Sequence, residues 1–395
     1  MLRSLYSGIS GLRSHQTMLD VTGNNIANVN TAGFKSSSVQ FEDTLSQLTK
    51  GASAPNGTAG GSNPAQVGLG VQVAGIATNF NQGSAQATGK STDMMISGDG
   101  FFAVSAGGQQ LYTRDGSFSL DAAGHLVTPD GATLQGWPAV NGVVATGGAI
   151  GDLTVSSTAL APAKATTSST VSGNLPAESA AGATLNRQIN VYDATGNATS
   201  LNVTFTRTAS GWTATGTDAA GNTGTANLAF TNGKLDPAAS TAGGTMTVGG
   251  IAVDMSKVTG FTGMTSVTMD GQDGRAAGTL ESFSIAKDGT IMGAFSNGAK
   301  EPVGQVAMAR FANDAGLEKA GNSEYKVSAN SGAAVLGTAG AAGFGGISAG
   351  SLEMSNVDLS QEFTNLIVAQ RGFQANARII TTSDQVLQEL VDLKH

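Results

Sequence analysis

Apolar residues recur at alternating steps of three and four positions close to both ends of the chain. Near the N-terminus this spacing is followed by Leu2, Leu5, Ile9, Leu12 and Leu19. Such a stripe lies along one face of an α-helix and predicts an amphipathic helix. The next residues are rich in Asn and Gly, which accept left-handed backbone and end helices. We therefore expect this helix to end between Asp20 and Asn30.

A second and longer stripe occupies the C-terminal segment. Its positions keep a three-four repeat, formed by Phe363, Leu366, Gln370, Phe373, Ala377, Ile380, Asp384, Leu387 and Val391. This is the repeat of a coiled-coil seam. Ser355, Asn356 and Asp358 are candidate N-caps just before it. The pattern predicts one helix from about Leu359 to Leu393.

Between the two stripes the pattern is typical of β-structure. Leu201, Val203 and Phe205 alternate with polar residues, and a similar alternation begins at Val71 and Val73. Both predict strands with one buried face. Hairpin-type turns are indicated by Asp-Gly and Asn-Gly pairs at positions 99–100, 115–116, 130–131, 141–142, 232–233, 288–289 and 297–298.

Small and polar residues mark the expected loops and boundaries. Residues 51–66 are rich in Gly, Ala and Ser and predict a flexible loop. The stretch 156–180 and the segment 271–280 are the expected limits between two β domains, and residues 333–350 lead into the C-terminal helix. The expected fold is mixed α and β, with paired N- and C-terminal helices and two mainly-β domains inserted between them.

Composition and charge exclude several classes of partner for this chain. The chain of 395 residues contains 56 Gly and no Cys, and carries a net charge of −8. An acidic chain lacks the basic surface that attracts nucleic acids and anionic membranes. No apolar run approaches the ~18 residues of a membrane span, and the first residues lack the apolar core of a cleaved signal peptide. We expect no nucleic-acid partner, no membrane insertion and no cleaved export signal.

The sequence offers no constellation of residues for catalysis, cofactor binding or metal binding. His15, His125 and His395 are scattered, without a second ligand at metal-binding spacing. The segment from Gly83 to Ser91 has five residues between its glycines, where a phosphate-binding loop needs four, and predicts a turn. We therefore expect a structural protein and not an enzyme.

The two helical stripes differ in length. A helix over residues 359–393 would be about 50 Å long at ~1.5 Å per residue, and the N-terminal helix would cover about half of it. Each apolar side chain that stays exposed to water loses the ~1.5–3 kcal/mol of stabilising free energy that its burial would contribute. We expect part of the C-terminal stripe to stay bare in a monomer and to pack against other copies. A two-stranded coiled coil, or a secreted β-rich adhesin that oligomerises through this helix, is the alternative.

Both ends of the chain also carry motifs that resemble those of bacterial flagellar rod and hook proteins. In the N-terminal run from 20 to 35, the motif residues are Asn24, Asn25, Asn28, Gly33, Phe34 and Lys35. In the C-terminal run from 355 to 378, they are Ser355, Asn356, Val357, Asp358, Gln370 and Arg371. Segments resembling the family's core β domain lie at 67–73, 98–102, 113–118 and 311–317.

Total length separates the branches of this family. The distal rod protein lacks a large central insertion, whereas this chain has one at roughly residues 146–277, which favours the hook branch. A distal rod or other axial protein is the alternative. The resemblance implies four layers: an inner helical tube (1–30 with 358–395), connecting segments (31–70 with 325–357), an inner β domain (71–145 with 278–324) and an outer β domain (146–277).

The resemblance also implies a function, a location and partners. Hook subunits polymerise helically into a curved tube outside the cell that acts as a universal joint and passes motor torque to the filament. The implied partners are copies of the same chain, the hook cap, the distal rod, the hook–filament junction proteins and the flagellar type III export machinery. Self-assembly is expected to rest on Leu5, Ile9, Leu12, Leu19, Phe363, Leu366, Phe373, Ala377, Ile380, Leu387 and Val391.

Overall fold

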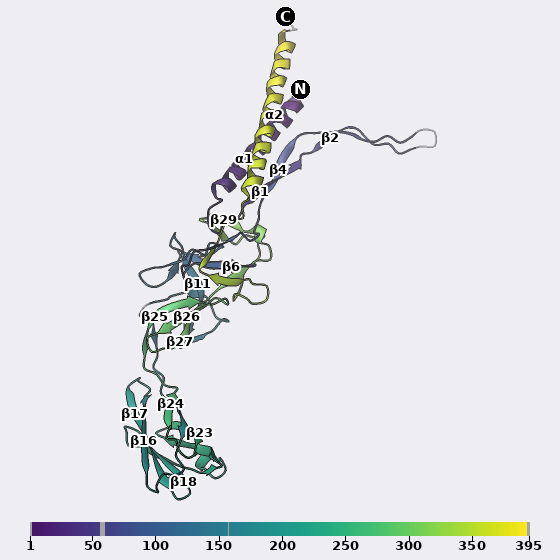
Figure 1. Cartoon of the computed structure of the whole chain (residues 1–395). Helices are drawn as coiled ribbons and strands as arrows, with labels where there is room; N and C mark the ends of the chain where they lie inside the picture. The colour runs from purple at the N-terminus through teal and green to yellow at the C-terminus, as the bar shows by residue number, and fades with distance from the viewer. Residues whose placement is uncertain (1, 56–59, 157, 393–395) are drawn as a thin grey trace.

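The chain is elongated, with both termini in a helix pair at one end and a β domain at the other (Figure 1). The computed structural model describes residues 2–55, 60–156 and 158–392. The helices are α1 (Leu2–Ala27) and α2 (Leu359–Asp392). This arrangement confirms the expected fold class. The predicted helix limits agree with the structure, except that Leu393 lies outside the described residues.

Local hydrogen bonds fix the start of α2. The Asp358 carboxylate accepts hydrogen bonds from the backbone amides of Ser360 and Gln361, at 2.9 and 3.3 Å. This is the N-cap contact that satisfies amides left free in the first turn. Over the described residues, neither helix contains a stretch that is both long and apolar enough to cross a membrane.

A two-stranded arm leaves the chain after α1 and projects sideways (Figure 1). Its base is the antiparallel pair β1 (Ser37–Asp43) and β4 (Val71–Thr78), and its outer part is the pair β2 (Ser46–Lys50) and β3 (Ala65–Gly68). The pairing continues to a bridge between Ser53 and Ser62. The predicted loop at 51–66 is therefore wrong at both ends, because these residues are hydrogen-bonded across the arm; residues 56–59 lie outside the described residues.

The inner β region follows the arm, and its main sheet combines strands from before and after the outer domain. The principal order is β14 (Leu160–Ala161), β25 (Gly278–Ile285), β26 (Thr290–Phe295), β27 (Lys300–Val306), β11 (Thr133–Val140), β7 (Phe101–Ala106), β8 (Gln109–Thr113), β30 (Glu324–Lys326) and β29 (Glu318–Gly321). Shorter strands attached to it are β9 (Ser119–Leu120), β10 (Leu126–Val127), β12 (Val143–Val144), β13 (Gly151–Asp152), β28 (Met308–Arg310) and β31 (Val335–Gly337). Its fully buried core includes Ile96, Phe102, Val104, Leu134, Ile291 and Val306.

Two short strand pairs tie this region to the segment that leads into α2. They are β5 (Ala85–Ala87) with β33 (Ser351–Glu353) and β6 (Met94–Ser97) with β32 (Gly346–Ala349). A 3₁₀ turn, η2 (Asp314–Gly316), lies between β28 and β29. The segment that leads into α2 therefore runs beside the segment that follows the arm.

The outer β domain has two sheets with an apolar core between them. One sheet contains β15 (Ser168–Asn174), β20 (Phe230–Thr231), β21 (Lys234–Leu235), β22 (Thr245–Val248), β23 (Ile251–Thr259) and β24 (Thr268–Gln272). The other contains β16 (Thr184–Tyr192), β17 (Ala198–Thr208), β18 (Gly211–Thr217) and β19 (Thr223–Leu228). A 3₁₀ turn, η1 (Thr241–Gly244), lies between β21 and β22. Leu201, Val203 and Phe205 point into the core while the residues between them do not, which confirms that predicted strand.

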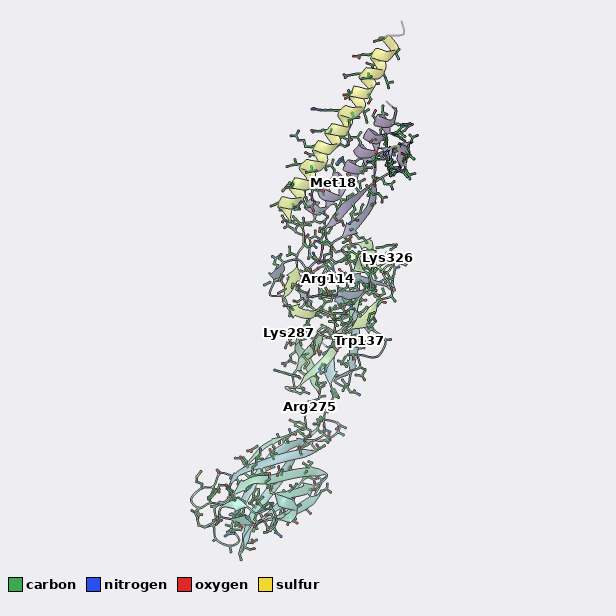
Figure 2. The ribbon with its side chains drawn as sticks, turned by 90° about the vertical axis from the view of Figure 1, so that its right-hand side faces the viewer. Met18, Arg114, Trp137, Arg275, Lys287 and Lys326 are labelled. Atoms are coloured by element: carbon green, nitrogen blue, oxygen red, sulfur yellow. The ribbon has the colours of Figure 1, made fainter. Side chains whose placement is uncertain are left out.

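A narrow neck joins the outer domain to the inner region (Figure 1). Lys164 and Arg275 exchange backbone hydrogen bonds of 2.9 and 2.8 Å there, and Figure 2 shows Arg275 at this constriction. The expected division at 146 is corrected by this geometry, because β13 and β14 pair with β11 and β25 of the inner sheet. The expected division at 71 is corrected as well, because β4 belongs to the arm.

Most of the predicted Asp-Gly and Asn-Gly turns connect paired strands. Asn141–Gly142 and Asn232–Gly233 have positive φ at both residues, the conformation of the tight turns that close two-residue hairpins. The pair at 99–100 is an exception, because the strands on either side of it, β6 and β7, do not pair with each other. The pair at 115–116 is another. Gly116 runs alongside Met94 and accepts its amide hydrogen bond at 2.9 Å, so that prediction of a hairpin is wrong.

Candidate functional site

The two terminal helices meet along faces made of small side chains. Among the helix residues whose burial the structure describes, Gly8, Gly11, Ser14, Thr22 and Asn25 are buried in α1, and Ala369 is buried in α2. A Cβ atom at Gly11 would lie 2.7 Å from the Asn376 side chain, and one at Gly372 would lie 2.5 Å from the His15 ring. The side chains at a helix contact set how closely the axes approach, so these glycines allow a close pairing.

The predicted seam of α2 only partly faces α1. Leu366, Ala377 and Ile380 are half-buried, whereas the large side chains of the other predicted positions are exposed: Phe363, Phe373, Leu387 and Val391. The contact face is centred one position earlier, on Ala369, Gly372 and Asn376. On α1, the predicted residues Leu5, Ile9, Leu12 and Leu19 are all half-buried.

Outside its contact with α1, the helix α2 leaves a set of large apolar side chains exposed along its length, and we call this set the bare face. It comprises Leu359, Phe363, Ile367, Val368, Phe373, Ile379, Val386, Leu387 and Val391. Ile367 and Val391 are 56% and 62% exposed. Figure 1 shows that α2 also continues past the N-terminal end of α1. The expectation that part of the stripe is bare in a single chain is confirmed, because Phe363, Phe373, Leu387 and Val391 are all exposed.

The close helix contact gives a matched pair of substitutions within α1. Gly11→Ala should weaken the pairing because its Cβ would press on Asn376, whereas Gly23→Ala meets no atom within 4 Å. Ala is favoured over Gly inside a helix by roughly 0.5–1 kcal/mol, so Gly23→Ala should stabilise the chain by about that amount. Gly11→Ala should leave the stability of the chain unchanged or lower it. Thermal unfolding of both variants followed by circular dichroism checks this, and equal gains would contradict the close contact.

The other side of α1 contacts the arm. The ring centroids of His15 and Phe41 are 5.9 Å apart, and the backbone amide of Val71 donates a hydrogen bond of 3.3 Å to Ser10 Oγ. The helix α1 is thus held between α2 and the base of the arm.

A buried ion pair lies where the helices meet the inner β region. Lys35 Nζ donates to Glu353 Oε1 at 2.6 Å, and both side chains have no exposed surface. Lys35 also donates to the Asn81 carbonyl oxygen at 2.8 Å. The remaining Glu353 oxygen lies 3.4 Å from Arg114 Nη1, and the Gly83 amide donates to Oε1 at 2.8 Å. One carboxylate thus joins four segments that are distant in sequence.

The charged groups of this site are buried, and burial affects the pKa of Lys35. Burial lowers the pKa of the Lys35 ammonium, and the hydrogen bond and charge of Glu353 oppose that shift. Arg114 lies over the Phe101 ring at 5.3 Å and donates to the Gly98 carbonyl oxygen at 2.9 Å. A buried pair of this kind is maintained by its full set of hydrogen bonds, and removal of one member leaves an uncompensated charge.

Two asparagines complete what we call the polar junction, which consists of Asn25, Lys35, Arg114, Glu353 and Asn356. The Asn25 amide donates to the Ser37 carbonyl oxygen at 2.8 Å and to Glu362 at 3.1 Å, while its oxygen accepts the Ser37 amide at 3.0 Å. Asn356 accepts the Ser36 amide at 2.8 Å and donates to the carbonyl oxygens of residues 79 and 81. The junction fixes the direction in which both helices leave the β body.

The other motif residues lie around this junction or on the open faces of the helices. Gly33 has φ of +67° and donates to the Glu353 carbonyl oxygen at 2.8 Å, in a place where a Cβ would collide with residue 115. Lys319 lies over the Phe34 ring at 5.4 Å. Asn24, Gln370 and Arg371 are exposed on the helices, and Asn28 is half-buried in the turn that follows α1. Ser355, Val357 and Asp358 lie in the segment that immediately precedes α2.

Sequence reasoning missed Glu353, Arg114 as its partner, and Gly83. Glu353 is one of 28 acidic residues and shares no local pattern with Lys35, from which it is separated by 318 positions. The available signal was its location within two residues of the Ser355 motif.

The fold and its surfaces define a class: a chain with a β body and paired terminal helices, of which α2 leaves large apolar side chains exposed. Three family models match it: "Flagella basal body rod protein" at residues 5–35, "Flagellar hook protein FlgE/F/G D1 domain" at 95–207 and "Flagellar basal body rod FlgEFG protein C-terminal" at 348–393. The chain belongs to the FlgE/F/G family of flagellar rod and hook proteins.

Full-length relatives support this assignment. The flagellar hook protein FlgE of Borreliella burgdorferi is 40% identical over 100% of both chains, and that of Salmonella typhimurium is 36% identical over 99% of this chain and 100% of its own. The flagellar basal-body rod protein FlgG of Bacillus subtilis is 34% identical over 100% of both chains. The crystal structure of Helicobacter pylori flagellar hook protein FlgE2 aligns at a TM-score of 0.49 with 14% identity, covering 68% of this chain and 100% of that one.

Proposed function

We propose that this chain is a structural subunit of the bacterial flagellar hook. It polymerises helically into a curved tube that acts as a universal joint and transmits motor torque to the filament. The bare face of α2 is the observation that carries the proposal, together with full-length relatives named as hook proteins at 40% and 36% identity. The hook is part of the flagellum outside the cell, and we place this chain there.

The bare face requires another chain to cover it. Phe363, Ile367 and Val368 are each more than half exposed, and burying each would contribute ~1.5–3 kcal/mol. Within one chain, α1 is already engaged with the side of α2 that carries Gly372 and Asn376 and with the arm. Copies related by a non-closing, head-to-tail contact cover such faces one after another and build a helical tube.

The β domains suit a tube that bends as it rotates. Within the described residues, the outer domain is attached through the neck, where Lys164 and Arg275 pair, so it can shift relative to the inner region while the helices stay packed. Polar contacts between neighbouring β domains exchange more readily than large apolar ones, because water replaces a broken hydrogen bond. We therefore assign closure of the tube to the helices and sliding to the outer layers.

The proposal extends to partners and export. We propose contacts with the distal rod at one end of the tube, with the hook–filament junction proteins at the other, and with the hook cap during assembly. We also propose that the chain travels unfolded through the flagellar type III export machinery without a cleaved signal peptide. The helix pair and the polar junction would then form only at the growing tip.

A distal rod subunit is the second candidate, favoured by the Bacillus subtilis relative named as a rod protein. Complementation separates the two candidates. A hook subunit restores hooks and motility to a strain that lacks its hook gene and leaves a rod-deficient strain unrestored. The reverse result would assign the chain to the rod.

A charge placed on the bare face tests the assembly. Ile367→Asp should leave the monomer folded, because the side chain is 56% exposed, but should abolish tubes of the purified chain in electron micrographs. Met264→Asp is the matched control, since Met264 is a 63% exposed apolar residue of the outer domain. Tubes from the Ile367→Asp chain at the unmodified yield would contradict the proposal.

A further inference from the structure

A cleft opens beside the end of α1 on the surface of the inner β region. Its volume is about 670 Å³, and its walls are the last turn of α1, the turn at Pro129–Asp130 and the tip of the β29–β30 hairpin. Three carboxylates line it, those of Asp115, Asp130 and Glu324. We call this the acidic cleft.

Glu324 is the unusual member of this group. Glu324 is only 6% exposed. Its Oε1 atom is buried, and no hydrogen bond to that atom is formed within the described residues. Asp130, by contrast, accepts hydrogen bonds from Thr128 at 2.6 Å and Asn322 at 3.1 Å. Burial, and secondarily the charge of Asp130, raise the pKa of the Glu324 carboxyl. Burial also raises the pKa of Asp115.

Neither of the two cations nearby forms an ion pair with Glu324 in the described chain. Lys319 lines the cleft, but its Nζ donates to Ser37 Oγ at 2.9 Å. Arg114 is committed to Glu353 in the polar junction. Among the described residues, Glu324 therefore has no ion-pair partner, and a buried carboxylate without a partner is costly.

The geometry favours an organic cation over a metal ion. Within the described ranges, no group of three or more acidic or His side chains is arranged to hold a metal. A guanidinium group differs from a metal ion because it brings its own planar set of donors, which match a carboxylate and can reach more than one acceptor.

The exposed side of α2 carries two arginines without acidic partners. Arg371 Nη1 has a 3.5 Å contact with Gln374, and neither Arg371 nor Arg378 forms an ion pair in the described chain. They are separated by seven positions and so project from the same side of the helix. If the bare face is covered by a neighbouring copy, these charges are drawn into the same interface and need carboxylates there.

We propose that the acidic cleft receives the guanidinium group of Arg371 or Arg378 from a second copy of this chain. This inference rests on the proposed function, because it requires the subunits to assemble through α2. In this arrangement the cleft fixes the register of one subunit on the next, whereas the apolar face alone would permit sliding. Charged pairs at an interface contribute such register and orientation.

The first test replaces the carboxylate with its neutral isostere. Glu324→Gln should raise the critical concentration for polymerisation of the purified full-length chain about tenfold or more, a change of about 1.4 kcal/mol per subunit contact. The melting temperature of the monomer should stay the same or rise, because the unpartnered charge is removed. If Glu324 had only a structural role, the substitution would instead lower the melting temperature and leave the critical concentration unchanged. Glu281→Gln, on an exposed position of β25, is the matched control.

A charge exchange tests the partner. Glu324→Arg should prevent tube formation, and adding Arg371→Glu or Arg378→Glu should restore it, as judged by sedimentation and electron microscopy. Unchanged polymerisation of Glu324→Gln would overturn the inference while leaving the hook proposal standing. Failure of both double variants would overturn the assignment to arginine. If the unmodified chain forms no tubes, the proposed function and this inference both fail.

Discussion

Replacing Glu353 with alanine should lower the free energy of unfolding by about 3–5 kcal/mol, the typical result of breaking a buried ion pair. Lys35 would keep its charge in a site with no exposed surface, and Arg114 would lose its carboxylate partner. The Gly83 amide would also lose its acceptor. Denaturant unfolding followed by tryptophan fluorescence measures the change, with Trp137 reporting on the inner region and Trp212 on the outer domain.

An ion pair on the surface provides the control for this substitution. Glu318 contacts Lys326 at 3.0 Å, and both side chains are about half exposed. Glu318→Ala should therefore cost less than ~1 kcal/mol. A similar small loss for Glu353→Ala would show that water or another group compensates Lys35, and the polar junction would then not be the element that holds the helices to the β body.

The junction links stability to assembly. It determines the direction in which α1 and α2 leave the inner region, and that direction sets how neighbouring copies meet through the bare face. A variant that loosens the junction can retain both β domains and still fail to form regular tubes. We therefore expect polymerisation to be more sensitive than the outer domain's own unfolding to changes at Lys35 or Glu353.

The parts of the fold that were predictable from sequence depend on short-range patterns. The three-four repeat gave both helices, because every position on one helical face contributes to the same signal. Asn232–Gly233 predicted a hairpin because the positive φ values it adopts are open to Asn and Gly and costly for most residues. Each of these features is decided within a few residues of chain.

The features that escaped prediction depend on distant or small residues. Strands β2 and β3 are exposed on both faces, so no alternation of apolar and polar residues revealed the outer part of the arm. The face of α2 toward α1 centres on Ala369 and Gly372, whose small side chains add little to a hydrophobic pattern. The prediction followed the large apolar residues instead, and it therefore placed the seam one position too late. The Lys35–Glu353 pair spans 318 positions, and only the folded chain brings it together.

A single methyl group at Gly83 should damage the polar junction as much as the loss of a charge. The Cβ of Gly83→Ala would overlap the carbonyl oxygen of Met354, a backbone atom that cannot turn aside as a side chain can. The strand pair β5–β33 would have to separate, and the hydrogen bond from the Gly83 amide to Glu353 would lengthen or break. Overpacking costs about 1–3 kcal/mol, and a hydrogen bond to a charged group about 1.5–3 kcal/mol.

Gly75→Ala is the matched control, because Gly75 lies in β4 and has no atom within 4 Å of the added Cβ. This variant should match the unmodified chain in denaturant unfolding and in tube formation, whereas Gly83→Ala should unfold earlier and form few or irregular tubes. If both variants behave alike, the approach of Met354 to Gly83 is looser than the structure indicates. If Gly83→Ala is destabilised and yet forms normal tubes, the junction supports the fold without setting the geometry of assembly. These two outcomes separate the role of the junction in holding the chain together from its role in directing the helices toward the next subunit.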